Sequence, residues 1–225
     1  MEVLARNILK NAKLFQDMRD IERDSLISCL SPQVKHYIKN EIIIMSGDTV
    51  QSIGIILTGT ASAYTEDING NRTIMSDLTP MSVFGEILVS TRIHKSPVTV
   101  YATSDVTAAF FEYQKIYSTC AMACEAHRIF IQNILQAIGD KYFLMFDRIN
   151  ILRQKTLRAR LLAYFYILSG RGETQTVTIP YTKTMLAEYL LVNRSALSKE
   201  LHKMEQDGLI TINGRKVWLK KQLRP

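Results

Sequence analysis

The side chains best suited to chemistry in this chain are hydrogen-bond donors spaced along one short segment, residues 194–204. Guanidinium, ammonium and hydroxyl groups recur there on one side of a helical repeat, and apolar Leu197, Leu201 and Met204 recur on the other. Such donors suit the base edges and phosphate oxygens of DNA. The donors are Arg194, Ser195, Ser198, Lys199 and Lys203. Glu200 is expected at the margin of the same face.

Two helices must position these donors. Thr182 is placed to cap a helix that closes at Leu191-Val192, and Asn193 is placed to cap the next one. Two short helices joined this tightly predict a helix-turn-helix, whose second helix fits the major groove of DNA. Helix N-termini favour phosphate contacts, which we expect from Thr182, Lys183 and Asn193. The alternative is that the basic residues form only a solvated helix face.

A hairpin after this segment makes the pattern more specific. Residues 209–212 and 216–219 are rich in β-formers and flank Asn213-Gly214, a strong signal for a two-residue turn. Arg215 and Lys216 lie at the predicted tip, where they would contact the flanking DNA backbone. A helix-turn-helix followed by such a basic wing predicts a winged-helix DNA-binding domain.

Charge is distributed unevenly over the 225 residues. Residues 153–225 contain 14 Lys and Arg against 5 Asp and Glu, a net charge of +9, whereas residues 1–152 carry a net charge of −2. A basic third on a slightly acidic body indicates a polyanionic partner confined to one part of the chain. With the helix-turn-helix present, we expect that partner to be double-stranded DNA and not a membrane.

Several other classes of protein fit the sequence poorly. No apolar run approaches the ~20 residues that span a bilayer, and residues 1–13 lack the apolar region of a signal peptide. Three cysteines argue against a disulfide framework, so we expect a cytoplasmic protein. The chain contains no phosphate-cradling glycine loop, nucleophile elbow or His-Glu metal motif. We therefore expect that the protein is not an enzyme, and we assign no catalytic residue and no metal site.

The pattern of residues 1–121 predicts one domain, which begins with a short helical region and continues with β-strands. Residues near 1–30 are expected to be helical, and short β-prone segments separated by turn residues follow from Val34 to Tyr113. Many short strands at regular spacing are typical of a sandwich or barrel. The expected strands are 41–45, 52–57, 61–65, 72–76, 98–102 and 108–111.

A long helix is expected from about Met122 to Leu152. Apolar residues recur in it at alternating spacings of four and three, the heptad pattern of a coiled coil. This seam predicts a homodimer, whereas the alternative is a helix packed on its own domain. The seam residues are Ile131, Leu135, Ile138, Tyr142, Met145, Ile149 and Leu152. Off the seam, and expected to meet the β-domain, are Phe130, Ile134, Phe143 and Phe146.

The order of these elements resembles the Crp/Fnr family of bacterial transcription regulators over essentially the whole chain. The most specific motifs are Phe84-Gly85-Glu86 and residues 194–201, and turns at Gly47-Asp48, Gly59 and Asn69-Gly70 also match. The resemblance implies a homodimer that binds a two-fold operator, contacts RNA polymerase and responds to a small-molecule effector.

The resulting fold class is α+β, with three expected segments. Residues 1–121 form a β-roll (a double-stranded β-helix, or jelly roll) of the cyclic-nucleotide-binding type that senses the effector. Residues 122–152 form the dimerisation helix, and residues 153–225 form the winged helix-turn-helix domain.

The sequence departs from the cyclic-AMP-binding members of the family. An Arg-Ser pair binds the cyclic phosphate in those proteins, and the corresponding slot here reads Ser96-Pro97, without the guanidinium. Lys95 or Arg92 would supply charge in a different geometry. We therefore predict an effector other than cyclic AMP, namely an aromatic or hydrophobic small molecule with or without negative charge. The expected effector residues are Gly85, Glu86, Lys95, Ser96, Val98, Tyr142 and Phe143.

Two alternatives remain open for the regulatory domain. The β-roll could be purely structural in a constitutive DNA-binding protein, with Glu86 an ordinary surface or turn carboxylate. Cys120 and Cys124, four residues apart, could instead make the regulator redox-responsive, although two thiols are an incomplete metal site. The iron–sulfur cluster of the family's oxygen-sensing branch is not expected, because no cysteine precedes Cys29. No cofactor is assigned beyond the unknown effector.

Overall fold

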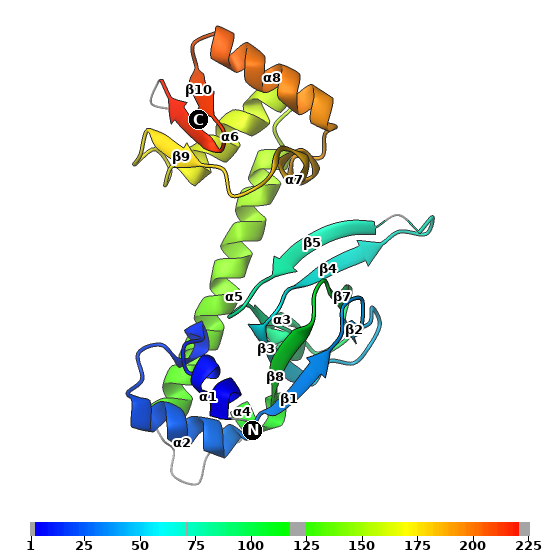
Figure 1. Ribbon diagram of the computed structural model, residues 1–225, viewed down its shortest axis with the longest axis vertical. Helices are drawn as coiled ribbons and strands as arrows, with labels where there is room; N and C mark the ends of the chain where they lie inside the picture. Colours follow the sequence, from blue (N-terminus) through cyan, green and yellow to red (C-terminus); the bar gives the residue numbers. More distant parts are fainter. Residues whose placement is uncertain (1–2, 71, 118–124, 221–225) are drawn as a thin grey trace. The chain divides into compact units, whose positions relative to one another are not determined.

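The computed structural model describes residues 3–70, 72–117 and 125–220 (Figure 1). The chain divides into two compact units, Met1–Asp140 and Lys141–Pro225, and the boundary falls inside the longest helix, α5 (Glu125–Leu152). Each unit encloses a hydrophobic core of its own. Within the described ranges, no helix has both the length and the apolar character that crossing a membrane requires.

The first unit contains a β-roll of two four-stranded antiparallel sheets. Its strands are β1 (Gln33–Tyr37), β2 (Ile42–Ile44), β3 (Ser52–Thr58), β4 (Ala61–Glu66), β5 (Arg72–Leu78), β6 (Val83–Phe84), β7 (Thr99–Ala102) and β8 (Val106–Glu112). One sheet has the order β1-β8-β3-β6 and the other the order β2-β7-β4-β5. The predicted β-roll is therefore confirmed. Sequence reasoning missed β1, which is mostly polar, and β6, which has two residues.

Helices close one end of the β-roll. They are α1 (Val3–Leu9), a 3-10 turn at Lys13–Phe15, α2 (Asp20–Leu30), α4 (Tyr113–Tyr117) and the beginning of α5, while α3 (Glu86–Val89) follows β6. Three buried rings join these elements, because Phe130 of α5 lies 5.2 Å from Phe15 and 5.6 Å from Phe111 between ring centroids. Asn133 donates from Nδ2 to the carbonyls of Leu14 and Gln16, at 3.0 Å each.

The long helix is buried along one part and exposed along another. Phe130 and Ile134 are in the core of the first unit, as predicted. Phe143 and Phe146 are 60% and 45% exposed and belong to neither core, so their contact with the β-domain stays a prediction. The predicted start of this helix, at Met122, lies outside the described residues.

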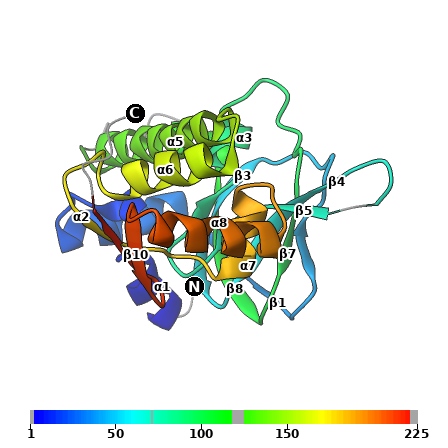
Figure 2. The ribbon, with the colours of Figure 1, turned by 90° about the horizontal axis from the view of Figure 1, so that it is seen from above.

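The second unit is a winged helix, seen from a second direction in Figure 2. Its elements after α5 are α6 (Leu157–Leu168), β9 (Thr176–Thr178), α7 (Lys183–Tyr189), α8 (Arg194–Gln206), β10 (Ile210–Asn213) and β11 (Lys216–Leu219). The strands form one antiparallel sheet in the order β10-β11-β9. The core joins Leu161 and Phe165 of α6 to Leu197, Leu201 and Met204 of α8.

The hairpin turn lies one residue later than predicted. Asn213 pairs with Lys216 across the ladder, so the two loop residues are Gly214 and Arg215 and not Asn213 and Gly214. Gly214 has a φ of 61°, which glycine adopts without the steric cost that a Cβ brings. The shift leaves Arg215 in the loop itself.

Candidate nucleic-acid interface

Side-chain caps set the positions of α7 and α8. The Thr182 hydroxyl accepts a hydrogen bond from the backbone N–H of Met185 at 3.2 Å, and Asn193 Oδ1 accepts one from the N–H of Ala196 at 2.7 Å. Both predicted caps are therefore present. Helix α7 ends at Tyr189, and Leu191 takes a left-handed conformation with φ 55°, so the chain reverses within a few residues before α8.

The predicted apolar face of α8 is buried, and the donor face is open. Leu197, Leu201 and Met204 are at most 5% exposed. At about 100° per residue, Ser195 and Lys199 lie nearest the centre of the outer face, and Lys203 lies to one side of it. Ser198 and Arg194 lie further round on the other side, toward the buried face. Ser198 is half-buried, and the other four predicted donors are exposed.

Sequence reasoning missed two residues on the outer face of α8. His202 and Gln206 are exposed and follow Ser198 at steps of four, so they continue the line of that face. His202 Nε2 lies 3.1 Å from Gln206 Nε2, within hydrogen-bond distance. The i, i+4 spacing was the signal that could have identified them.

The hydroxyls on this interface are not equivalent. Ser195 Oγ donates to Asn193 Oδ1 at 2.8 Å, so its proton is used within the cap and its lone pairs remain to accept a hydrogen bond. An acceptor suits the exocyclic amino groups of adenine and cytosine. Thr182 accepts within its cap, so its own O–H is left to donate to a phosphate oxygen.

Ion pairs join α8 to α6 on the side away from the proposed DNA-facing surface. Arg158 of α6 donates from Nε to Glu200 and from Nη1 to Asp207, at 2.6 Å each. Glu200 is therefore turned toward α6 and does not lie at the margin of the DNA-facing side, which corrects the expectation from the sequence. Glu205 accepts from the backbone N–H of Ile212 at 2.8 Å and ties the wing to α8. These contacts remove negative charge from the outer face.

The predicted phosphate-contacting cations are exposed. They are Lys183 at the start of α7 and Arg215 and Lys216 of the wing. In the part of the chain that the structure describes, neither these three nor Arg194, Lys199 and Lys203 form an ion pair. Uncompensated cations on one surface attract a polyanion.

The Gly-Glu motif of the first unit is part of its internal structure. Gly85 has a φ of 83°, and a Cβ at this position would lie 2.9 Å from the carbonyl oxygen of Ser52. Glu86 begins α3 and is 1% exposed, so the reading of Glu86 as a surface carboxylate is wrong.

The slot that would hold a cyclic phosphate is filled by local contacts. The Ser96 hydroxyl donates to the carbonyl of Val98 at 2.7 Å, and Ser96 is 3% exposed. Lys95 is exposed. Tyr142 and Phe143 belong to the second unit and are exposed, so their assignment to the effector stays a prediction.

The described ranges can be searched for a metal site but do not test the redox alternative. There, no group of three or more His, Cys, Asp and Glu side chains could hold a metal ion. Cys29 is exposed and forms no disulfide within the described residues. Cys120 and Cys124, the two cysteines of the redox alternative, lie outside the described residues.

A β-roll, a long helix and a winged helix with an open donor face define a DNA-binding protein with an effector-binding type of N-terminal domain. Two family models match it: "Cyclic nucleotide-binding domain" over residues 34–122 and "Crp-like helix-turn-helix domain" over residues 159–222. Together they cover more than half of the chain. The chain belongs to the Crp/Fnr family of DNA-binding transcription regulators.

Relatives of known function and structure share this organisation. The transcriptional activator protein FnrL of Cereibacter sphaeroides is 21% identical over 196 residues, which are 82% of this chain and 76% of FnrL. A CooA mutant from Carboxydothermus hydrogenoformans has a TM-score of 0.63 at 16% identity, over 95% of this chain and 90% of that one. The c-di-GMP responsive regulator CLP of Xanthomonas campestris has a TM-score of 0.61 at 15% identity, over 90% and 100%. These structures are alike in fold.

Proposed function

We propose that this regulator acts as a homodimer that places one α8 helix in each half of a two-fold operator. The observation that carries the proposal is the outer face of α8, where donors stand exposed while the opposite face is buried in the core. Two recognition helices related by a two-fold axis would enter successive major grooves about one DNA turn (~34 Å) apart.

Individual residues have different roles in this proposal. Arg194, Ser195, Ser198 and Lys199 read base edges, with arginine or lysine on guanine and the Ser195 oxygen accepting from an amino group. Lys203 flanks them. Thr182, Lys183 and Asn193 contact phosphates at the helix N-termini, and Arg215 and Lys216 contact the backbone from the wing.

Exposed apolar residues on α5 support the dimer. Leu135, Tyr142, Met145 and Ile149 of the predicted seam are each 54–62% exposed. Apolar side chains gathered along one helix and left open mark a surface that binds another protein, and the heptad spacing suits a second copy of the same helix. Ile131, Ile138 and Leu152 are half-buried and complete the proposed seam.

The proposal assigns one task to each of three segments. Residues 1–121 would sense the effector, residues 122–152 would join the subunits, and residues 153–225 would bind DNA. Family membership supports RNA polymerase as a further partner.

The effector we propose is a small molecule other than cyclic AMP. An anionic cyclic phosphate needs a cationic partner at the position of Ser96, and that hydroxyl is already bonded to Val98. An aromatic or hydrophobic effector held near Gly85, Glu86, Lys95, Ser96 and Val98 of the first unit requires no such clamp. Calorimetry with cyclic AMP should show no binding in the micromolar range, and such binding would overturn this part of the proposal.

A constitutive DNA-binding protein is the second candidate. It is favoured by the structural use of Gly85 and Ser96, which the fold needs whether or not a ligand binds. An operator affinity that no metabolite changes would support it. The redox-responsive alternative through Cys120 and Cys124 would instead require a change in operator affinity on oxidation, which Ser substitution at both positions should abolish.

Fluorescence anisotropy tests the central proposal. Purified protein is titrated onto its own upstream DNA and onto a scrambled duplex of equal length, across a series of salt concentrations. Tight binding to the upstream DNA alone supports a sequence-specific regulator. Equal binding to both duplexes that persists when candidate metabolites are added would contradict it.

A further inference from the structure

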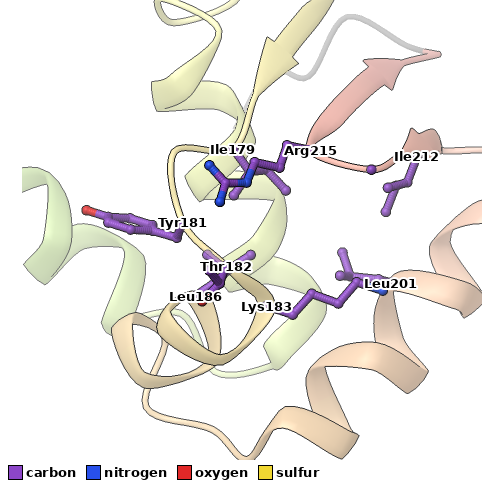
Figure 3. A pocket seen from close by; sticks show the side chains of 9 residues that line it. Ile179, Tyr181, Thr182, Lys183, Leu186, Leu201, Ile212 and Arg215 are labelled. Carbon is purple, nitrogen blue, oxygen red and sulfur yellow. The ribbon is translucent and has the colours of Figure 1, made fainter.

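The second unit contains a cavity beneath the wing that the proposed function does not use. Its volume is about 210 Å³, and it lies between the start of α7, the inner side of α8 and the β10–β11 hairpin (Figure 3). We propose that this cavity binds a small aromatic carboxylate, one ring in width, as a second ligand site separate from the β-roll.

The walls of the cavity are apolar. Ile179, Leu186 and Leu201 line it and are at most 7% exposed, and half-buried Ile212 lines it from the wing. The ring of Tyr181 adds an aromatic surface. Burial of apolar ligand surface against such walls is the main source of affinity in small-molecule sites.

Two cations stand at the mouth of the cavity. Figure 3 shows Arg215 reaching over it from the wing and Lys183 extending along it from α7. Neither forms an ion pair within the described ranges, so their charge is free to meet an anion. Apolar walls below two unpaired cations match a molecule with an apolar body and an anionic end.

The size of the cavity narrows the ligand class. Apolar cavities of about 150 Å³ accept benzene, so this volume suits one ring with a short acid group. A nucleotide is too large and too polar for these walls. The planar guanidinium of Arg215 suits a carboxylate, because it can donate two parallel hydrogen bonds.

Binding would act on the DNA interface directly. Lys183 and Arg215 are the residues to which the proposed function assigns phosphate contacts. A carboxylate held between them neutralises charge that the DNA backbone would otherwise meet, so the acid and DNA should compete. This consequence rests on the proposed function, whereas ligand binding itself does not.

Methyl NMR of the full-length protein, labelled at Ile and Leu methyls, tests the site with phenylacetate as the probe. We expect saturable shifts at Ile179, Ile212 and the two leucines of the cavity, with a Kd on the order of 1 mM for a ligand of this size. Methyls of Ile53 and Ile55, buried in the β-roll, serve as the internal control. Shifts confined to the β-roll, or none in the cavity at saturating probe, would overturn the proposal.

Two substitutions and a matched ligand sharpen the test. Ile212→Phe fills the cavity and should weaken phenylacetate at least tenfold, and surface Arg215→Gln should weaken it about threefold to tenfold. Phenylacetamide has the shape of phenylacetate without its charge, so it should bind wild-type protein more weakly than the acid does. Its affinity should be the same for Arg215→Gln as for wild type. If the Ile212→Phe protein does not fold, the affinities of Arg215→Gln for the acid and of wild type for the amide still test whether the cavity binds a carboxylate. Unchanged affinity for the acid in Arg215→Gln would contradict the site.

Anisotropy with operator DNA then separates the two proposals. Phenylacetate should weaken operator binding by wild-type protein. The Ile212→Phe variant should need at least tenfold more phenylacetate for the same loss of operator affinity. Shifts of the cavity methyls without competition would leave the ligand site standing and count against phosphate contacts by Lys183 and Arg215. Failure of the methyl titration would remove the ligand site and leave DNA binding untouched.

Discussion

The two regions that carry the family's motifs use their side chains in opposite ways. On α8 and the wing, the predicted contact residues are exposed except for half-buried Ser198, and Arg158 binds Glu200 on the side of α8 that faces α6. In the β-roll, the motif residues serve the fold itself, because Gly85 fits against Ser52 and Ser96 bonds to Val98. The first region is built to meet an external partner. The second has motif positions that the fold would require without any ligand.

The difference shows which motif matches predict function. Where a family motif consists of exposed hydrogen-bond donors on a helix, a match to it identifies side chains that are available to bind a partner. A match made of glycine and buried polar residues identifies a backbone conformation first. Substitutions should therefore change DNA binding in the second unit and stability in the first.

Gly85→Ala should have the largest effect and act on stability. The methyl group adds a left-handed conformational cost and a close approach to the Ser52 carbonyl, about 2–4 kcal/mol together. Gly70→Ala is the matched control, since Gly70 has φ 82° with nothing within 4 Å of its Cβ position, and about 1 kcal/mol is expected. Urea unfolding followed by circular dichroism measures the loss.

Trp218 provides an internal check on that experiment. It is the single tryptophan of the chain and lies in the second unit, so its fluorescence follows the winged helix alone. Gly85→Ala should leave the fluorescence transition in place. A fluorescence shift as large as the dichroism shift would break the comparison between the two regions.

Leu135→Glu should dissociate the dimer. Leu135 is a 60% exposed member of the proposed seam, and a charge on each subunit would meet its equivalent in the partner. The dimer Kd should rise at least 100-fold, about 2.7 kcal/mol, as measured by sedimentation equilibrium. Its neighbour Gln136 is exposed and off the seam, so Gln136→Glu should leave the Kd within a few-fold. Equal effects from both would argue against the seam.

Arg194→Ala should alter base reading without altering stability. Loss of a guanidinium at a base edge costs about 1–3 kcal/mol and relaxes specificity at one base pair. Competition anisotropy against single-position operator variants measures both quantities. Unchanged discrimination at every position would remove Arg194 from base readout.

Lys183→Ala should have the smallest effect. Loss of one phosphate contact weakens operator and random DNA alike and reduces the slope of log K against log salt by about 1. A salt series on both duplexes measures it. A slope equal to that of wild type would mean that Lys183 does not contact phosphate.

Local patterns in the sequence predicted most of the second unit. The caps at Thr182 and Asn193 and the division of α8 into buried and exposed faces depend on neighbours a few residues away. Strands β1 and β6 were missed, because one is mostly polar and the other has two residues, and only their partners in the sheet identify them.

By itself, the sequence determined the order of the domains, the two faces of the recognition helix and the basic character of the unit that carries it, because periodicity and charge are properties of neighbouring residues. Only the tertiary structure decided that Glu200 turns to Arg158, that Glu86 is buried, and that Arg215 and Lys183 line the same apolar cavity. Each of these depends on residues that are distant in the chain and that packing brings together.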